Sequence, residues 1–156
     1  MVSSAPGAAP DAPAHAAVSF IMPRAAGSFD VKLDPLPFGA GVDDPMFGRR
    51  SIDKRYHGDL DATGVGQMLS AGTSVQGSAG YVAMERVSGR LHGRAGTFAL
   101  QHSGTMTRGA PDLSVTVVPD SGTGQLSGLA GTMRIIIAGG KHSYEFDYML
   151  GAAGPT

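Results

Sequence analysis

Apolar and polar residues alternate with a period of two along much of the chain, in short runs that end at glycine or proline. Such alternation places successive side chains on opposite faces of a β-strand, whereas Gly and Pro are typical of the turns between strands. Eight runs predict strands, at residues 29–33, 50–56, 65–70, 81–87, 97–106, 113–118, 133–138 and 142–150. No stretch shows a helical period, so we expect an all-β chain.

Eight strands with short connections predict an eight-stranded antiparallel β-barrel, because a closed sheet leaves no strand edge exposed. A sandwich of two sheets is the alternative. We expect the barrel to occupy residues 28–150, after a flexible N-terminal extension at 1–27 and before a C-terminal tail at 151–156. The start of the extension is rich in Ala, Pro and Ser and lacks the basic and apolar regions of a signal peptide.

Glycine and proline also predict the connections. The segment 36–45, which contains several Pro and Gly residues, is expected to form a loop over the mouth of the barrel. Residues 58–64 are expected to turn the second strand into the third, and Ser88-Gly89 to end the fourth. Gly139-Gly140 predicts a tight turn before the last strand.

The composition narrows the functional classes. With 12 Lys and Arg against 13 Asp and Glu the net charge is −1, so the chain lacks the basic field that drives binding to nucleic acid. No apolar run reaches the length of about 18 residues that a membrane-spanning helix needs, so we expect no membrane partner. The absence of cysteine excludes disulfides, thiolate nucleophiles and cysteine-ligated metal sites. A cytoplasmic protein is compatible with this composition, and that is the location we expect.

Five histidines raise the question of a metal site. His15 lies in the extension, and His57, His92, His102 and His142 show neither a helical i,i+4 spacing nor a short-loop ligand cluster. We therefore expect no metal and no other cofactor.

A resemblance to a known family is carried by the motifs Gly58-Asp59, Tyr81-Val-Ala-Met-Glu-Arg86, Gly93-Arg-Ala-Gly-Thr-Phe-Ala-Leu-Gln-His102, Val118-Pro-Asp-Ser-Gly-Thr-Gly-Gln-Leu126 and His142-Ser-Tyr144. In this order they resemble a bacterial family of small uncharacterised proteins with an allene-oxide-cyclase-like β-barrel, over about residues 28–150. The family usually has a Trp in its first strand where this chain has Leu33, a change that either enlarges a cavity or is repacked. Barrels of this kind hold apolar, reactive molecules and guide ring closure by confinement, so the resemblance implies a lumen suited to such use.

Glu85 and His102 are the candidate catalytic residues. Glu85 shares a strand face with Tyr81, Ala83 and Val87, where burial would raise the pKa of its carboxyl toward the range useful for proton transfer. The alternative is an ion pair with Arg94 or with a residue of a neighbouring strand, which would only fix the register.

His102 and Gln101 are adjacent, so in a regular strand only one of them can face the lumen. His102 has the parity of Phe98 and Leu100, which favours the apolar face, where a neutral imidazole could act as an acid, a base or a donor. A histidine on such a face can equally be a hydrogen-bonded core residue.

The candidate ligand-binding residues are Tyr81, Gln101 and an aromatic row in the last strand, formed by Tyr144, Phe146 and Tyr148. This row either lines a ligand cavity or fills the barrel, and filling is the default because small eight-stranded barrels leave little free space.

The sequence therefore supports two hypotheses of function. In the first, the lumen binds an apolar or polyketide-like small molecule, and the protein acts on it as a cofactor-free cyclase or isomerase. In the second, the protein is a noncatalytic binding or structural barrel with a filled core, whose polar strand residues serve register and the contacts of a homo-oligomer.

Overall fold

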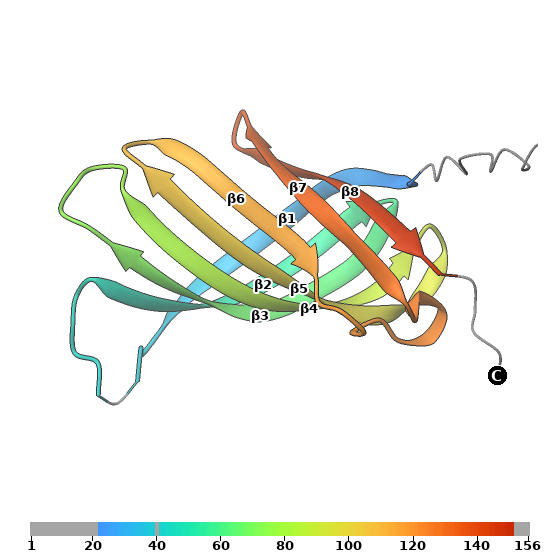
Figure 1. Ribbon diagram of the computed structural model, residues 1–156, viewed down its shortest axis with the longest axis horizontal. Coiled ribbons are helices and arrows are strands. Elements are labelled where there is room, and N and C mark those ends of the chain that lie inside the picture. The colour runs from blue at the N-terminus through green and yellow to red at the C-terminus, as the bar shows by residue number, and fades with distance from the viewer. Residues whose placement is uncertain (1–21, 40, 152–156) are drawn as a thin grey trace, which may run out of the picture.

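The alternating runs form strands that extend beyond the pattern at most of their ends, because the ladder of backbone hydrogen bonds continues past the last apolar residue. In the computed structural model, which describes residues 22–39 and 41–151, the strands are β1 (Arg24–Leu36), β2 (Phe47–Gly58), β3 (Leu60–Gly72), β4 (Ala79–Leu91), β5 (Arg94–Thr107), β6 (Ala110–Val117), β7 (Leu129–Ala138) and β8 (Lys141–Leu150). Each strand pairs antiparallel with the next, and β8 returns to pair with β1 (Figure 1). The predicted all-β, eight-stranded antiparallel barrel is confirmed.

The predicted first strand begins earlier than expected, since β1 starts at Arg24, and most of the predicted extension lies outside the described residues. No helix of the described residues has the length and apolar character needed to cross a membrane. The remaining regular element is a short 3₁₀ turn, η1 (Gly124–Leu126).

Two of the predicted connections differ from the structure. The turn predicted over 58–64 is shorter, because β2 runs to Gly58 and β3 already begins at Leu60. Ser88-Gly89 does not end β4, which continues to Leu91. A Cβ on Gly89 would lie 2.3 Å from the carbonyl oxygen of Asp61, so this glycine permits close approach of β3 instead of breaking the strand. The tight turn at 139–140 is confirmed.

The two ends of the barrel differ. We call the end that carries the connections 37–46, 73–78, 108–109 and 139–140 the mouth, and the opposite end, where both described ends of the chain lie, the base (Figure 1). At the base, the segment between β6 and β7 continues along β5, with Val118 N–H donating to Ala99 O (2.9 Å) and Thr123 N–H to Thr97 O (2.8 Å). Leu126 of η1 is thereby buried against this end.

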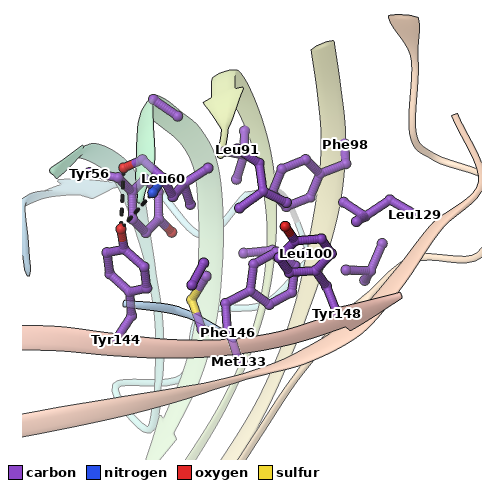
Figure 2. Close-up of a cluster of buried hydrophobic side chains, with 14 of the residues drawn as sticks. Tyr56, Leu60, Leu91, Phe98, Leu100, Leu129, Met133, Tyr144, Phe146 and Tyr148 are labelled. Atoms are coloured by element: carbon purple, nitrogen blue, oxygen red, sulfur yellow. Dashed lines mark hydrogen bonds between the residues drawn. The ribbon is translucent and has the colours of Figure 1, made fainter. Parts of the chain in front are cut away.

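Large side chains of the inner face fill the base half of the lumen. They come from strands β2 to β5, β7 and β8: Tyr56, Leu60, Leu91, Phe98, Leu100, Leu129, Met133, Tyr144, Phe146 and Tyr148 (Figure 2). The hydroxyl of Tyr144 accepts a hydrogen bond from Leu60 N–H (2.9 Å) and donates to His57 O (2.8 Å), which ties β8 to the β2–β3 turn. The base half is therefore a packed core.

The mouth half of the lumen is open. Four large apolar side chains share the inner face with the core residues, yet they are exposed: Leu33 (38%), Met106 (43%), Leu113 (41%) and Ile137 (67%). All four lie near the mouth ends of their strands. Packing therefore ends partway up the barrel, and apolar surface above it faces solvent.

In the loop between β1 and β2, predicted to lie over the mouth, Phe38 is turned to the outer face of the barrel instead. Phe38 stacks on Phe47 at a ring separation of 5.5 Å, and the two rings contribute to hollows on the outer face of the barrel. The Pro and Gly residues of this segment predict that the chain turns there, but they do not determine to which side of the barrel the loop folds.

Candidate functional site

A buried carboxylate lies where the packed core meets the open half of the lumen. Glu85 of β4 points inward, and its side chain is fully buried. Gly64 of β3 makes the necessary space, because a Cβ there would lie 2.1 Å from Oε2 of the carboxylate. The carboxylate can therefore extend across the inner face of β3 toward β2.

Three side chains bind this carboxylate. Lys54 Nζ lies 3.0 Å from Oε1, and His102 Nε2 lies 3.0 Å from the same oxygen. The hydroxyl of Tyr56 donates to Oε2 at 2.5 Å. All four residues face the lumen, and none of the buried polar side-chain atoms in the described residues lacks a hydrogen-bond partner. The four residues, which we call the Glu85 cluster, thus form a satisfied polar group inside an apolar barrel.

The charge of Glu85 differs from the sequence-based expectation. Desolvation raises the pKa of its carboxyl, but the hydrogen bond from His102, the charge of Lys54 and the hydrogen bonds from Tyr56 and Lys54 outweigh burial and lower the pKa below its usual value. The expected upward shift is therefore wrong in direction. The carboxyl is an anion at neutral pH, and Glu85 is not an acid that releases a proton near pH 7.

The ion-pair partner also differs from the one considered. Glu85 pairs with Lys54 of β2, two strands away, and not with Arg94; its partner on the adjacent strand β5 is His102. The pairing skips β3 because Gly64 and Gly66, the two β3 positions nearest the pair on this face, carry no side chain. Lys54 also lies 4.9 Å from the ring centroid of Phe29, so the ammonium group is enclosed by a carboxylate and aromatic rings.

The ionised carboxylate sets the tautomer of His102. A carboxylate can only accept hydrogen bonds, so Nε2 of His102 carries the proton that it shares with Glu85. In the neutral ring the other nitrogen, Nδ1, is then an acceptor. Within residues 22–39 and 41–151 Nδ1 makes no hydrogen bond, and the side chain of His102 as a whole is 4% exposed. A carboxylate that orients a histidine in this way is a common arrangement for a general base.

Tyr81 lies near this histidine on the side of the mouth. It shares the inner face of β4 with Glu85, and its ring lies against Gly104 of β5, where a Cβ would approach Cε1 to 2.5 Å. Gly104 is two residues from His102 on the same face. Desolvation, followed by the charge of Glu85, raises the pKa of Tyr81, so its hydroxyl stays protonated and can donate. The structure therefore brings Glu85 and His102 into contact and places Tyr81 on the same inner face, toward the mouth.

The other predicted ligand-binding residues lie elsewhere. Gln101 is exposed on the outer face of the barrel, as its parity with respect to His102 requires. Tyr144, Phe146 and Tyr148 lie in the packed base half, where Phe146 stacks on Phe98 at 5.8 Å and Tyr148 hydrogen-bonds His92 (2.5 Å). Figure 2 shows the rings of the three β8 aromatic residues directed into the core. They therefore fill the barrel below the Glu85 cluster.

Lys54 and Tyr56 are the members of the cluster that the sequence did not single out. Their alternation with Ile52 places them on one strand face, and that face is the inner one. A lysine that shares a strand face with apolar residues was therefore visible in the sequence as a candidate. The sequence did not indicate which residue would pair with it. In the described part of the chain no group of three His, Cys, Asp or Glu side chains is arranged to hold a metal ion.

Comparisons with known proteins identify relatives but no activity. Residues 25–148 match the model of a family described as "Protein of unknown function (DUF3224)". A crystal structure of a protein of unknown function from this family, from Shewanella oneidensis MR-1, is 50% identical to the chain, with a TM-score of 0.79. The match covers 85% of this chain and 100% of that one. No curated protein matches the chain.

Proposed function

The chain belongs to the DUF3224 family of proteins of unknown function, and we propose that it binds an apolar or polyketide-like small molecule in the mouth half of its lumen and isomerises or cyclises it without a cofactor. The observation that carries the proposal is a histidine bound through one ring nitrogen to a buried carboxylate, where the packed core meets the mouth half of the lumen.

The lining of the mouth half indicates the class of ligand. Leu33, Met106, Leu113 and Ile137 offer apolar surface above the Glu85 cluster, and contact with an apolar ligand would remove this surface from water. Tyr81 adds one hydroxyl donor on the way to His102. A mostly apolar molecule with a single carbonyl group fits these apolar and hydroxyl groups, beside which Arg50 of β2 lies exposed on the same inner face.

The chemistry that this geometry supports is proton transfer next to a carbonyl. Nδ1 of His102 would accept a proton from the carbon beside the carbonyl, and the C–H electron pair would form the double bond of an enolate. Tyr81 would donate a hydrogen bond to the developing oxyanion, and Glu85 would stabilise the imidazolium through Nε2. Return of the proton to another carbon completes an isomerisation. Attack of the enolate carbon on a second carbonyl of the same molecule would instead close a ring, as the C=O π bond of that carbonyl breaks and its oxygen takes the proton from His102.

Deuterium exchange into a plain apolar ketone tests this chemistry without knowledge of the natural substrate. Incubation of 2-decanone with the protein in D₂O should speed exchange beside the carbonyl, as measured by mass spectrometry. His102→Gln keeps an N–H donor for Glu85 but removes the base, so exchange should fall to the rate in buffer. Tyr81→Phe should slow exchange by about 100-fold or more, which is the usual scale for loss of one oxyanion donor.

His57→Gln is the matched control, because His57 is exposed and interacts with Asp30 outside the lumen. Exchange that persists in His102→Gln would refute the assigned base. The second hypothesis, a noncatalytic binding barrel, is favoured if native mass spectrometry finds a retained apolar molecule in the wild type and in His102→Gln alike, with no exchange in either.

A further inference from the structure

An open groove of about 870 Å³ lies on the outer face of the barrel, across β2 to β5. Its floor contains Leu69, Val82 and Met84, whose exposed fractions are 43%, 52% and 52%. Phe38 of the loop 37–46 borders the groove, and a second hollow of about 420 Å³ adjoins it and shares Phe38, Leu69 and Val82. These side chains are apolar residues at outward positions, where polar residues are the rule for a barrel in water.

A single cation is fixed in the lining of this groove. Nε of Arg49 donates to Gln67 Oε1 (2.9 Å), and Nη1 donates to Pro37 O (3.2 Å), so the guanidinium is held in place between the sheet and the loop. Among the residues that the structure describes, no carboxylate lies within ion-pairing distance of Arg49, in contrast to Arg24 and Arg55, which pair with Asp147 and Asp61. Nη2 of Arg49 is left without a partner in this part of the chain.

We propose that this groove binds an amphiphilic monoanion, a molecule with an apolar chain and one carboxylate. The carboxylate is placed at Arg49, where it meets an oriented and otherwise uncompensated guanidinium. The chain lies over Val82, Leu69 and Met84 beneath Phe38, and removes their exposed surface from water. The guanidinium of Arg49 thus binds the carboxylate of the ligand, and the apolar side chains of the same groove bind its chain.

The groove is separate from the lumen and independent of the function proposed for it. Both Gln101 and His102 border the groove, but neighbouring side chains of β5 face opposite sides of the sheet, and the imidazole of His102 lies on the inner side, bound to Glu85. A ligand in the groove lies behind the backbone of β4 and β5 as seen from the lumen. Substitutions of exposed groove residues should therefore leave the Glu85 cluster intact.

Calorimetric titration with decanoate tests the proposal, with 1-decanol as the uncharged analogue. Decanoate should bind, and decanol should bind at least about tenfold more weakly, since it lacks the charge that pairs with Arg49. Arg49→Gln and Val82→Glu should each weaken decanoate binding by about tenfold or more. Arg86→Gln and Val65→Glu are the matched controls, because both residues lie on the outer face outside the groove and Val65 is 55% exposed.

Three results would overturn the proposal. Equal affinities for decanoate and decanol would show that Arg49 plays no part. Loss of binding in Met106→Glu but not in Val82→Glu would place the decanoate in the lumen. The expected result is loss in Val82→Glu alone, and the function proposed for the lumen is then tested separately by the exchange assay. A wild-type dimer that Val82→Glu converts to a monomer in analytical ultracentrifugation would identify the groove as an interface between two copies of the chain.

Discussion

Replacing Glu85 with glutamine should strongly destabilise the barrel, because it leaves the charge of Lys54 buried without a counter-charge. The side chains of Glu85 and Lys54 are 0% and 6% exposed and 3.0 Å apart. Removal of one partner from a buried ion pair costs about 3–5 kcal/mol in the free energy of unfolding. The introduced amide can still accept one hydrogen bond, and Lys54 keeps its contact with the ring of Phe29, so we expect the lower end, about 3 kcal/mol.

Urea unfolding at pH 7 measures this loss, with four proteins compared: the wild type, Glu85→Gln, Lys54→Met and the double variant. Each single variant should be destabilised, whereas the double variant should recover much of the loss, because it leaves no unpaired charge inside the barrel. Asp34→Asn is the control. Asp34 lies 3.4 Å from Lys32 in an exposed pair, so its loss should cost less than about 1 kcal/mol.

Two results would refute this reasoning. A loss below about 1 kcal/mol in Glu85→Gln with an unchanged urea slope would mean that Lys54 is hydrated and not buried against the carboxylate. Strictly additive losses in the double variant would mean that the two residues do not interact.

Three further outcomes follow from the same packing. Since the pKa of Glu85 is lower in the folded state, its contribution to the free energy of unfolding should be complete above the unfolded-state pKa of about 4.3 and be lost as the pH falls through the folded-state pKa. Urea unfolding from pH 7 to pH 3 should show this loss in the wild type and a smaller loss in the variant that lacks both Glu85 and Lys54. Gly64→Ala should cost about 1–3 kcal/mol in urea unfolding by displacing the carboxylate of Glu85, whereas Gly72→Ala, whose Cβ meets no atom within 4 Å, should leave stability nearly unchanged. Tyr144→Phe should lower the free energy of unfolding by about 1–3 kcal/mol, because it leaves the N–H of Leu60 without its 2.9 Å partner, and an unchanged denaturation midpoint would contradict this role.

The faces of the strands were predictable from single residues and their neighbours. His102 with Phe98 and Leu100, and Glu85 with Val87, were placed on common faces, and the structure shows that these faces point inward. Such predictions succeed because side chains alternate strictly along a strand, whatever the strand pairs with.

The composition of the Glu85 cluster was not predictable in the same way. Lys54 and Glu85 are 31 residues apart, and they meet because β3 between them carries Gly64 on the inner face. The direction of the pKa shift of Glu85 depends on that meeting. Burial alone would raise the pKa, and only the neighbouring ammonium, imidazole and phenol groups reverse the sign.

The sequence by itself determined the all-β class, the eight strands and the alternation of side chains between the two faces of each strand. Alternation and turn residues set the local backbone structure over two to four neighbouring residues, so they can be recognised in a single sequence. The tertiary structure alone decided how the strands are staggered, and hence which inner residues lie at the same height. That stagger fills the base with the aromatic row of β8, leaves the mouth open, and brings a lysine, a carboxylate and a histidine together at the boundary between them.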